Sequence, residues 1–165
     1  MVFAYYNRLS RAQQRIYRRS DEVTSIRLPY SAALSDRVGE VASALESEDR
    51  QLTGDACRKL ATSIALSLKI ASVRVEVMAV RPARKWGELH GLYRPRHGGM
   101  PPTITVWMRT VKRRQVVAFR TFLRTFIHEL CHHLDYGLLN LPESFHTEGF
   151  YKRESSIVHQ LLENR

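Results

Sequence analysis

Cysteine is scarce in this sequence: Cys57 and Cys131 are the only two among 165 residues. Two cysteines are too few for a disulfide framework or for a four-cysteine zinc site. Long apolar stretches are absent as well, since no run approaches the roughly 20 residues that a membrane-spanning helix needs. The first residues carry only a brief apolar patch before several arginines, which is not the pattern of a secretory signal. We therefore expect a cytoplasmic protein in a reducing compartment, with no membrane partner.

Acidic residues are few relative to basic ones, with 16 Asp+Glu against 26 Lys+Arg and a formal net charge of +10. A basic surface favours phosphate-bearing partners, and nucleic acid is the candidate partner. The basic residues gather in four groups: Arg8, Arg11, Arg15 and Arg18 at helical spacing; Arg81, Arg84 and Lys85; Arg94 and Arg96; and Lys112, Arg113 and Arg114. The competing interpretation is a set of solvated faces, because no aromatic-rich basic strand of the base-stacking kind is present.

The spacing of apolar residues changes along the chain from helical to alternating and back. Helical spacing predicts helices over residues 10–19, 32–47 and 53–70. In the first of these, Leu9, Ala12 and Ile16 form the apolar side. Alternation and β-branched residues predict strands over residues 73–80, 87–93 and 103–108. Helical spacing returns over residues 116–134, and a last helix follows a break at residues 137–142. We expect one α+β domain over residues 1–165, with a helical part over 1–70 and a small mixed or antiparallel sheet and the last helices over 71–165.

One segment combines helical spacing with metal-binding residue types, and it contains His128-Glu129-x-x-His132. One helical turn separates the two histidines, so both imidazoles project from the same side and can hold one metal ion. Glu129 lies beside them, where its carboxylate can take a proton from a metal-activated water. Cys131 points elsewhere and is expected to be a small packing residue. The competing interpretation is a helix with polar residues on its outer face, but polar groups within such an apolar run are costly unless coordinated or paired.

A catalytic zinc ion needs a third protein ligand and keeps an open position for water. The candidates downstream are His133, Asp135, Glu143, His146, Glu148, Glu154 and His159. His133 points about 100° away round the helix, and Asp135 is carried past the metal, where it suits the orientation of an imidazole. His146 follows the chain reversal and precedes by four residues Phe150, where the apolar face of the last helix begins. The spacing therefore favours His146.

These motifs resemble those of the SprT-like zinc metallopeptidases, a family that includes the protease domain acting on DNA–protein crosslinks. That family has a small sheet, a helix with His-Glu-x-x-His and a second helix opened by His-Gly-x-x-Phe. Here the last element reads His146-Thr-Glu-Gly-Phe150, and Trp86-Gly87 and Thr103-Ile-Thr-Val are similar to the family's sheet. The resemblance covers roughly residues 86–157. It implies a zincin-like fold, zinc held by His128, His132 and His146, and Glu129 as the general base.

The sequence departs from the family pattern after the third histidine. Thr147 stands where the family has glycine, and the acid Glu148 follows it. Glu148 or Glu154 is therefore an alternative third ligand, as in glutamate-type zincins. Two cysteines also cannot form the four-cysteine zinc ribbon that many members carry.

The main functional hypothesis is a zinc-dependent metallopeptidase that hydrolyses peptide bonds in a peptide or protein substrate, with nucleic-acid-associated proteins as one candidate class. Residues 103–108 are expected to form the sheet edge that aligns the substrate. The candidate donors to a developing oxyanion are Tyr93, Tyr136 and Tyr151. A second hypothesis is a zincin-fold nucleic-acid-binding or regulatory module that holds a metal but has little protease activity. A third is a structural zinc closed by a fourth protein ligand such as Glu148.

Overall fold

The computed structural model describes residues 2–29, 32–84 and 87–163 of the chain. Within these ranges the fold is α+β, with five α-helices and a small three-stranded mixed sheet, which confirms the expected class. The elements in chain order are the 3₁₀-helix η1 (Ala4–Arg8), α1 (Arg11–Glu22), α2 (Ala32–Glu46), α3 (Arg50–Ser67), β1 (Arg74–Val80), β2 (Ala83–Arg84), β3 (Gly87–Glu88), β4 (Gly91–Arg94), β5 (Thr103–Arg109), α4 (Phe119–Gly137) and α5 (Glu148–Glu163). Trp86, part of the expected sheet motif, lies outside the described residues. None of the described helices combines the length and the apolar character that crossing a membrane requires.

Strand β5 is the central strand of the sheet, whose order is β1-β5-β4. It pairs in parallel with β1, where Val77 lies opposite Val106, and antiparallel with β4, where Tyr93 lies opposite Ile104. The expectation that residues 103–108 form a sheet edge is therefore wrong. The first four residues of β5 are all buried, as is typical of a strand covered on both faces. Strand β4 is one edge of the sheet instead.

The strand expected over residues 87–93 is divided in two. Strand β3 pairs antiparallel with β2 in a separate two-stranded ribbon, with Ala83 opposite Glu88. Strand β4 begins at Gly91 and joins the main sheet. The strands expected over residues 73–80 and 103–108 are confirmed to within a residue at either end.

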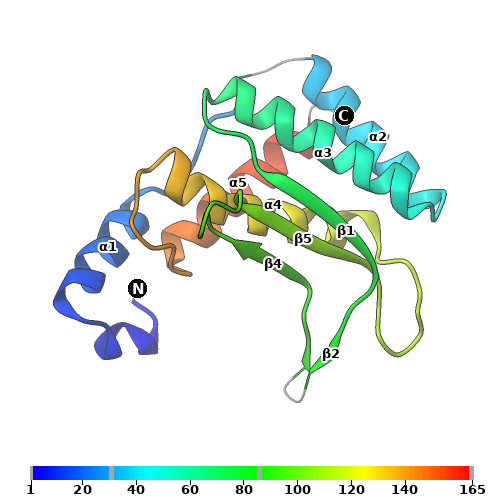
Figure 1. Cartoon of the computed structure of the whole chain (residues 1–165). Helices are drawn as coiled ribbons and strands as arrows, with labels where there is room; N and C mark the ends of the chain where they lie inside the picture. Colours follow the sequence, from blue (N-terminus) through cyan, green and yellow to red (C-terminus); the bar gives the residue numbers. More distant parts are fainter. Residues whose placement is uncertain (1, 30–31, 85–86, 164–165) are drawn as a thin grey trace.

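Helix α4 lies at the centre of the structure. It packs on β4 and β5 on one side and on α5 on another, while α3 covers β1 and α2 packs on α3 (Figure 1). Its side chains Phe122, Phe126 and Leu130 are at most 1 % exposed. They share one apolar core with Val106 and Met108 of β5. Because both sides of α4 are covered near its C-terminal half, the polar residues Glu129, His133 and Asp135 are buried there.

Helix α1 packs against α5, apart from α2 and α3. Figure 1 shows it at one end of the molecule, beside the chain that leads into α5. The expected apolar side of Leu9, Ala12 and Ile16 is not the buried side: Ala12 is exposed, and the buried residues of α1 are Tyr17 and Ser20. The ring of Tyr17 contacts the rings of other aromatic residues, namely Tyr5, Tyr6 and Phe145. The apolar contact of α1 is thus made by an aromatic ring and not by an aliphatic stripe.

Candidate metal centre

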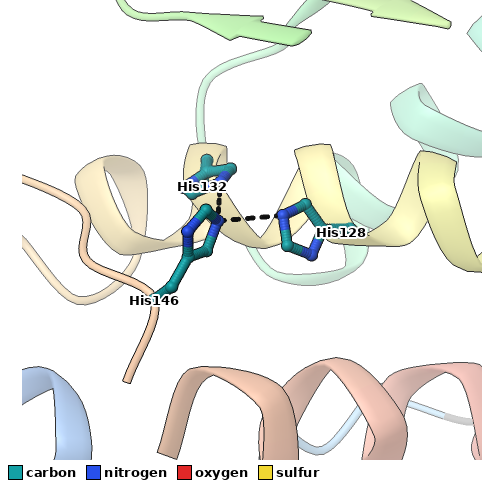
Figure 2. A group of neighbouring side chains, drawn as sticks. All are labelled: His128, His132 and His146. Atoms are coloured by element: carbon teal, nitrogen blue, oxygen red, sulfur yellow. Dashed lines mark hydrogen bonds between the residues drawn. The ribbon is translucent and has the colours of Figure 1, made fainter. Parts of the chain in front are cut away.

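Three histidine side chains converge between α4 and the segment before α5. The Nε2 atom of His146 lies 3.0 Å from Nε2 of His128 and 3.0 Å from Nε2 of His132. Figure 2 shows His128 and His132 projecting from neighbouring turns of α4, with His146 reaching them from the chain before α5. One nitrogen from each residue lies within 4.8 Å of the others. The three histidines are therefore close enough to hold one metal ion.

The outer nitrogens of the two α4 histidines are bound to oxygen acceptors. Nδ1 of His128 lies 2.8 Å from Oε2 of Glu154. Nδ1 of His132 lies 2.7 Å from Oγ of Ser144, whose hydroxyl donates to Asp135 Oδ2 at 2.6 Å. A carboxylate only accepts, and the Ser144 proton is already used, so both Nδ1 atoms must carry the hydrogen. In the neutral imidazoles the bare Nε2 lone pairs then face the centre, which is the form that binds a metal.

This arrangement of lone pairs fits a cation at the centre. His146 Nε2 carries at most one hydrogen, so it can satisfy only one of its two 3.0 Å contacts. If this nitrogen carries the hydrogen, the lone pair at its other contact has no donor, and if it is bare, both contacts bring lone pairs together. A bound cation would relieve either arrangement. In a tetrahedral site with bonds of about 2.0–2.1 Å the nitrogens lie about 3.3 Å apart, so small side-chain shifts suffice. An all-imidazole donor set suits zinc, copper, iron or nickel.

The electrostatic surroundings of His132 and His146 favour their neutral imidazoles. Burial lowers the pKa of His132 to about 3, helped by the charges of His146, His128 and Arg153. Burial also lowers the pKa of His146, with a further contribution from His128 and an opposing one from Glu154. Neutral imidazoles need no deprotonation before they bind a metal.

A phenylalanine ring forms the apolar base of the centre. The Phe150 ring lies 5.0 Å from the ring of His128, 4.8 Å from that of His132 and 5.2 Å from that of His146, measured between centroids. Phe150 is fully buried, at 0 % exposure. The four-residue spacing from His146 to Phe150 thus has a structural reason, because the first turn of α5 places the ring against all three imidazoles.

Glu129 lies beside the centre in the wall of a cavity of about 790 Å³. Its side chain is buried, and burial raises its pKa to about 7, against the lowering effects of His128 and of a hydrogen bond from the Tyr93 backbone. Such a pKa is well matched to accepting and returning a proton near neutral pH. Strand β4 passes close to this carboxylate, since a Cβ on Gly91 would lie 2.5 Å from Glu129 Oε1. Only glycine leaves room for the carboxylate here.

The other candidate ligands lie outside the cluster. Glu154 binds the outer nitrogen of His128, and Asp135 reaches His132 only through Ser144. The remaining candidates each contact another group: His133 the Ala71 carbonyl, Glu143 Gln13, Glu148 Lys152 and His159 Glu163. Among the described residues, only the three histidines form a group of metal-ligand geometry.

The three candidate tyrosines all line the cavity, but their hydroxyl groups differ. His133 Nε2 lies 2.9 Å from the Ala71 carbonyl and must donate to it, so its Nδ1 accepts from the Tyr93 hydroxyl at 3.2 Å. Burial raises the pKa of Tyr136, against the lowering effect of a hydrogen bond from the Ser144 backbone. Tyr151 stacks on His146 with 5.8 Å between centroids and is 42 % exposed. The Tyr93 hydroxyl proton is thus already used by His133, whereas the Tyr136 oxygen accepts from the Ser144 backbone and its proton can still be donated.

Some residues that support the centre were missed in the sequence-based prediction. Ser144 and Arg153 were not among the candidates, and Gly91 was taken only as part of an alternating strand. Arg153 is 0 % exposed and donates to Asp135 Oδ1 at 2.6 Å. A signal for it was present, because a charged residue three positions after Phe150 falls on the apolar stripe of the last helix.

The basic groups predicted from the sequence differ in accessibility. Arg81 is only 7 % exposed, so the prediction that it belongs to a phosphate-binding surface is wrong. Lys85 lies outside the described residues. The members of the four groups that the structure shows as exposed are Arg8, Arg11, Arg15, Arg18, Arg94, Arg96, Lys112, Arg113 and Arg114. Arg11, Arg15 and Arg18 are therefore an accessible arginine stripe on α1, whereas Arg8 belongs to η1 and not to the same helix.

Comparison of the chain with family models, with curated proteins and with solved structures finds no match. Membership of the SprT-like family therefore stays a prediction from the two histidine motifs. The geometry of the three histidines stands independently of that prediction.

Proposed function

We propose that this protein is a zinc-dependent metallopeptidase. The observation that carries the proposal is the geometry of the centre: three imidazole nitrogens converge beside a buried glutamate in the wall of an open cavity. Imidazole nitrogens are common zinc ligands, and catalytic zinc sites characteristically have three protein ligands. A glutamate that follows the first histidine is the residue type expected for a general base.

When bound, zinc would polarise a scissile carbonyl and make water a better nucleophile. His128, His132 and His146 would hold the ion through Nε2. Glu129 would accept the proton of the attacking water and return it to the leaving amine. Its burial supports this role, because a raised pKa makes both the uptake and the release of a proton easy near neutral pH.

The free edge of β4 is the proposed platform for an extended peptide. In the sheet order β1-β5-β4, no described strand pairs with the outer edge of β4. The cavity beside the centre is lined by Leu89, His90, Gly91, Leu92, Tyr93 and Pro95, which belong to β4 or flank it. Backbone pairing along this edge would align a peptide of varied sequence, with its carbonyl groups next to the histidines.

A purely structural zinc is less well supported. A closed structural site has four protein ligands. The acids that were candidates for the fourth place have other partners: Glu148 lies 2.8 Å from Lys152 Nζ, and Glu154 lies 2.8 Å from His128 Nδ1. Three ligands among the described residues leave a coordination position for water and substrate.

A metal-holding nucleic-acid-binding module is the second candidate function, and the exposed arginine stripe of α1 favours it. The two functions differ in whether the centre turns over substrate.

Zinc-loaded wild type and Glu129→Gln should be compared on an unfolded protein substrate, with and without single-stranded DNA. The control is Glu163→Gln, which alters an exposed carboxylate on α5. We expect cleavage by wild type and by the control, and none by Glu129→Gln although it retains zinc. Equal cleavage by Glu129→Gln would contradict the peptidase proposal.

A further inference from the structure

The N-terminal segment, residues 4–23, contacts the chain that carries the third histidine. The hydroxyl of Tyr5 donates to the backbone carbonyl of His146 at 2.7 Å. The amide of Gln13 donates to Glu143 Oε2 at 3.1 Å, three residues before that histidine. His146 lies in residues 138–147, which form neither helix nor strand. Its position therefore depends on contacts of this kind, and not on a hydrogen-bonded ladder.

The end of α1 is also joined to the beginning of α5. The Asp21 carboxylate accepts a hydrogen bond from the backbone N–H of Gly149 at 2.8 Å. Gly149 is the second residue of α5, where backbone N–H groups have no acceptor within the helix and a negative charge is favourable. The approach is so close that a Cβ on Gly149 would overlap the Asp21 carbonyl oxygen. Asp21 thus fixes the start of α5 just after His146.

A buried arginine connects the same segment to a second histidine. Arg153 donates to the Ser20 carbonyl at 2.8 Å, to Ser20 Oγ at 2.8 Å and to the Val23 carbonyl at 3.0 Å. Its guanidinium also donates to Asp135, which accepts from Ser144. Ser144 in turn accepts from Nδ1 of His132, so the chain of hydrogen bonds runs from residues 20–23 to a metal ligand.

We propose that the N-terminal segment is a positioning element of the metal centre, with Tyr5 and Asp21 as its positioning residues. Tyr5 fixes the backbone of His146, and Asp21 fixes the helix that begins two residues later. A ligand held in place before the metal arrives loses less conformational entropy on binding, so these contacts raise metal affinity. The inference rests on the metal centre of the proposed function but not on peptide hydrolysis.

The test uses two phenol deletions in the same short helix. Tyr5→Phe removes the hydrogen bond to His146 and keeps the ring that packs on Tyr17. Tyr6→Phe is the matched control, because its hydroxyl accepts from Arg18 and has no contact with the ligand segment in the described structure. The affinity of each full-length, metal-free protein for Co²⁺ is measured by titration of its visible absorption, and for Zn²⁺ by competition. We expect Tyr5→Phe to weaken binding about three- to tenfold, in line with the loss of one hydrogen bond. Tyr6→Phe should bind like wild type.

A second pair of variants separates positioning from simple stability. Asp21→Ala removes the acceptor for the Gly149 N–H, whereas Asp21→Asn keeps a side-chain oxygen in the same place. We expect weaker Co²⁺ binding and an altered Co²⁺ absorption spectrum for Asp21→Ala, with recovery of both in Asp21→Asn. The melting temperatures of the metal-free proteins report stability separately. Co²⁺ affinity and spectra that match wild type in both Tyr5→Phe and Asp21→Ala would overturn this inference alone. Failure of wild type to bind either metal would overturn the metal centre as well.

Discussion

Oε2 of Glu154 lies 2.8 Å from Nδ1 of His128, so this carboxylate binds the outer nitrogen of the histidine and not the metal position. Its other oxygen accepts from Arg124 at 3.1 Å. Glu148, the other acid considered as a third ligand, instead pairs with Lys152 near the protein surface. Neither acid therefore points at the metal position. Glu154 thus lies behind the His128 imidazole, and His146 is the third member of the histidine cluster.

We expect Glu154→Ala to weaken metal binding without abolishing it. Loss of a partner that orients a ligating histidine costs about 10- to 100-fold in metal affinity. Glu148→Ala should leave the affinity unchanged, because its carboxylate has no contact with the three histidines in the described structure. Competition titration with a zinc chelator measures both variants. A complete loss of zinc in Glu154→Ala, with zinc retained in His146→Ala, would show that the glutamate is the third ligand.

Gly91→Ala should impair catalysis and leave the metal in place. The added methyl group would lie 2.5 Å from Oε1 and 2.7 Å from Cγ of Glu129, so the carboxylate must move. Because misplacement of a catalytic group by about 1 Å can cost 100-fold, we expect a fall in kcat of at least about tenfold. The matched control is Gly39→Ala, which has open space within 4 Å. Zinc content and peptidase activity are measured together, and an active Gly91→Ala would argue against Glu129 as the base.

The sequence allowed the helices, the main strands and the first two histidines of the cluster to be predicted, because each follows from local periodicity. Residues 128 and 132 share a side of any helix, whatever surrounds it. The position of β5 was not predictable in this way, since residues 103–108 have the same pattern at a sheet edge or at its centre until the pairing partners are known. Gly91 was missed for a similar reason: its closeness to Glu129 arises only when β4 packs on α4.

The contact of the N-terminal segment with the ligands also depends on tertiary structure. Tyr5 and His146 are 141 positions apart in the sequence, and neither residue type indicates that the other is its hydrogen-bond partner. The Asp135–Arg153 pair has a weaker local signal, because both charged residues fall on apolar helix faces. A buried charge in such a place requires a partner, but periodicity does not identify which residue provides it.

Arg153→Met should destabilise the protein strongly. Both side chains of the Asp135–Arg153 pair are 0 % exposed, and the pair is joined at 2.6 Å. Removing the guanidinium leaves the Asp135 carboxyl buried without its partner, which costs about 3–5 kcal/mol of the free energy of unfolding. Lys152→Met, on the neighbouring exposed position, should have little effect. Urea unfolding of the metal-free variants measures both, and similar midpoints for the two would contradict the structural role of Arg153.

The nucleic-acid interpretation of the basic surface predicts a specific salt dependence. Arg11 and Arg15 are exposed on α1, so removing either would reduce the number of phosphate contacts. For each of Arg11→Ala and Arg15→Ala, affinity for single-stranded DNA should fall and the slope of log K against log salt should decrease by about one. Fluorescence anisotropy at several salt concentrations measures the slope. An unchanged slope in both variants would assign these arginines to a solvated face.

The metal content of protein purified without added metal tests the three-histidine centre most directly. Wild type, His146→Ala and Glu148→Ala are purified in parallel and measured by atomic emission. We expect one zinc ion per chain in wild type and in Glu148→Ala, and loss of zinc in His146→Ala. Absence of metal from wild type, even after zinc has been offered and the excess washed away, would contradict the metal centre and the peptidase function proposed from it.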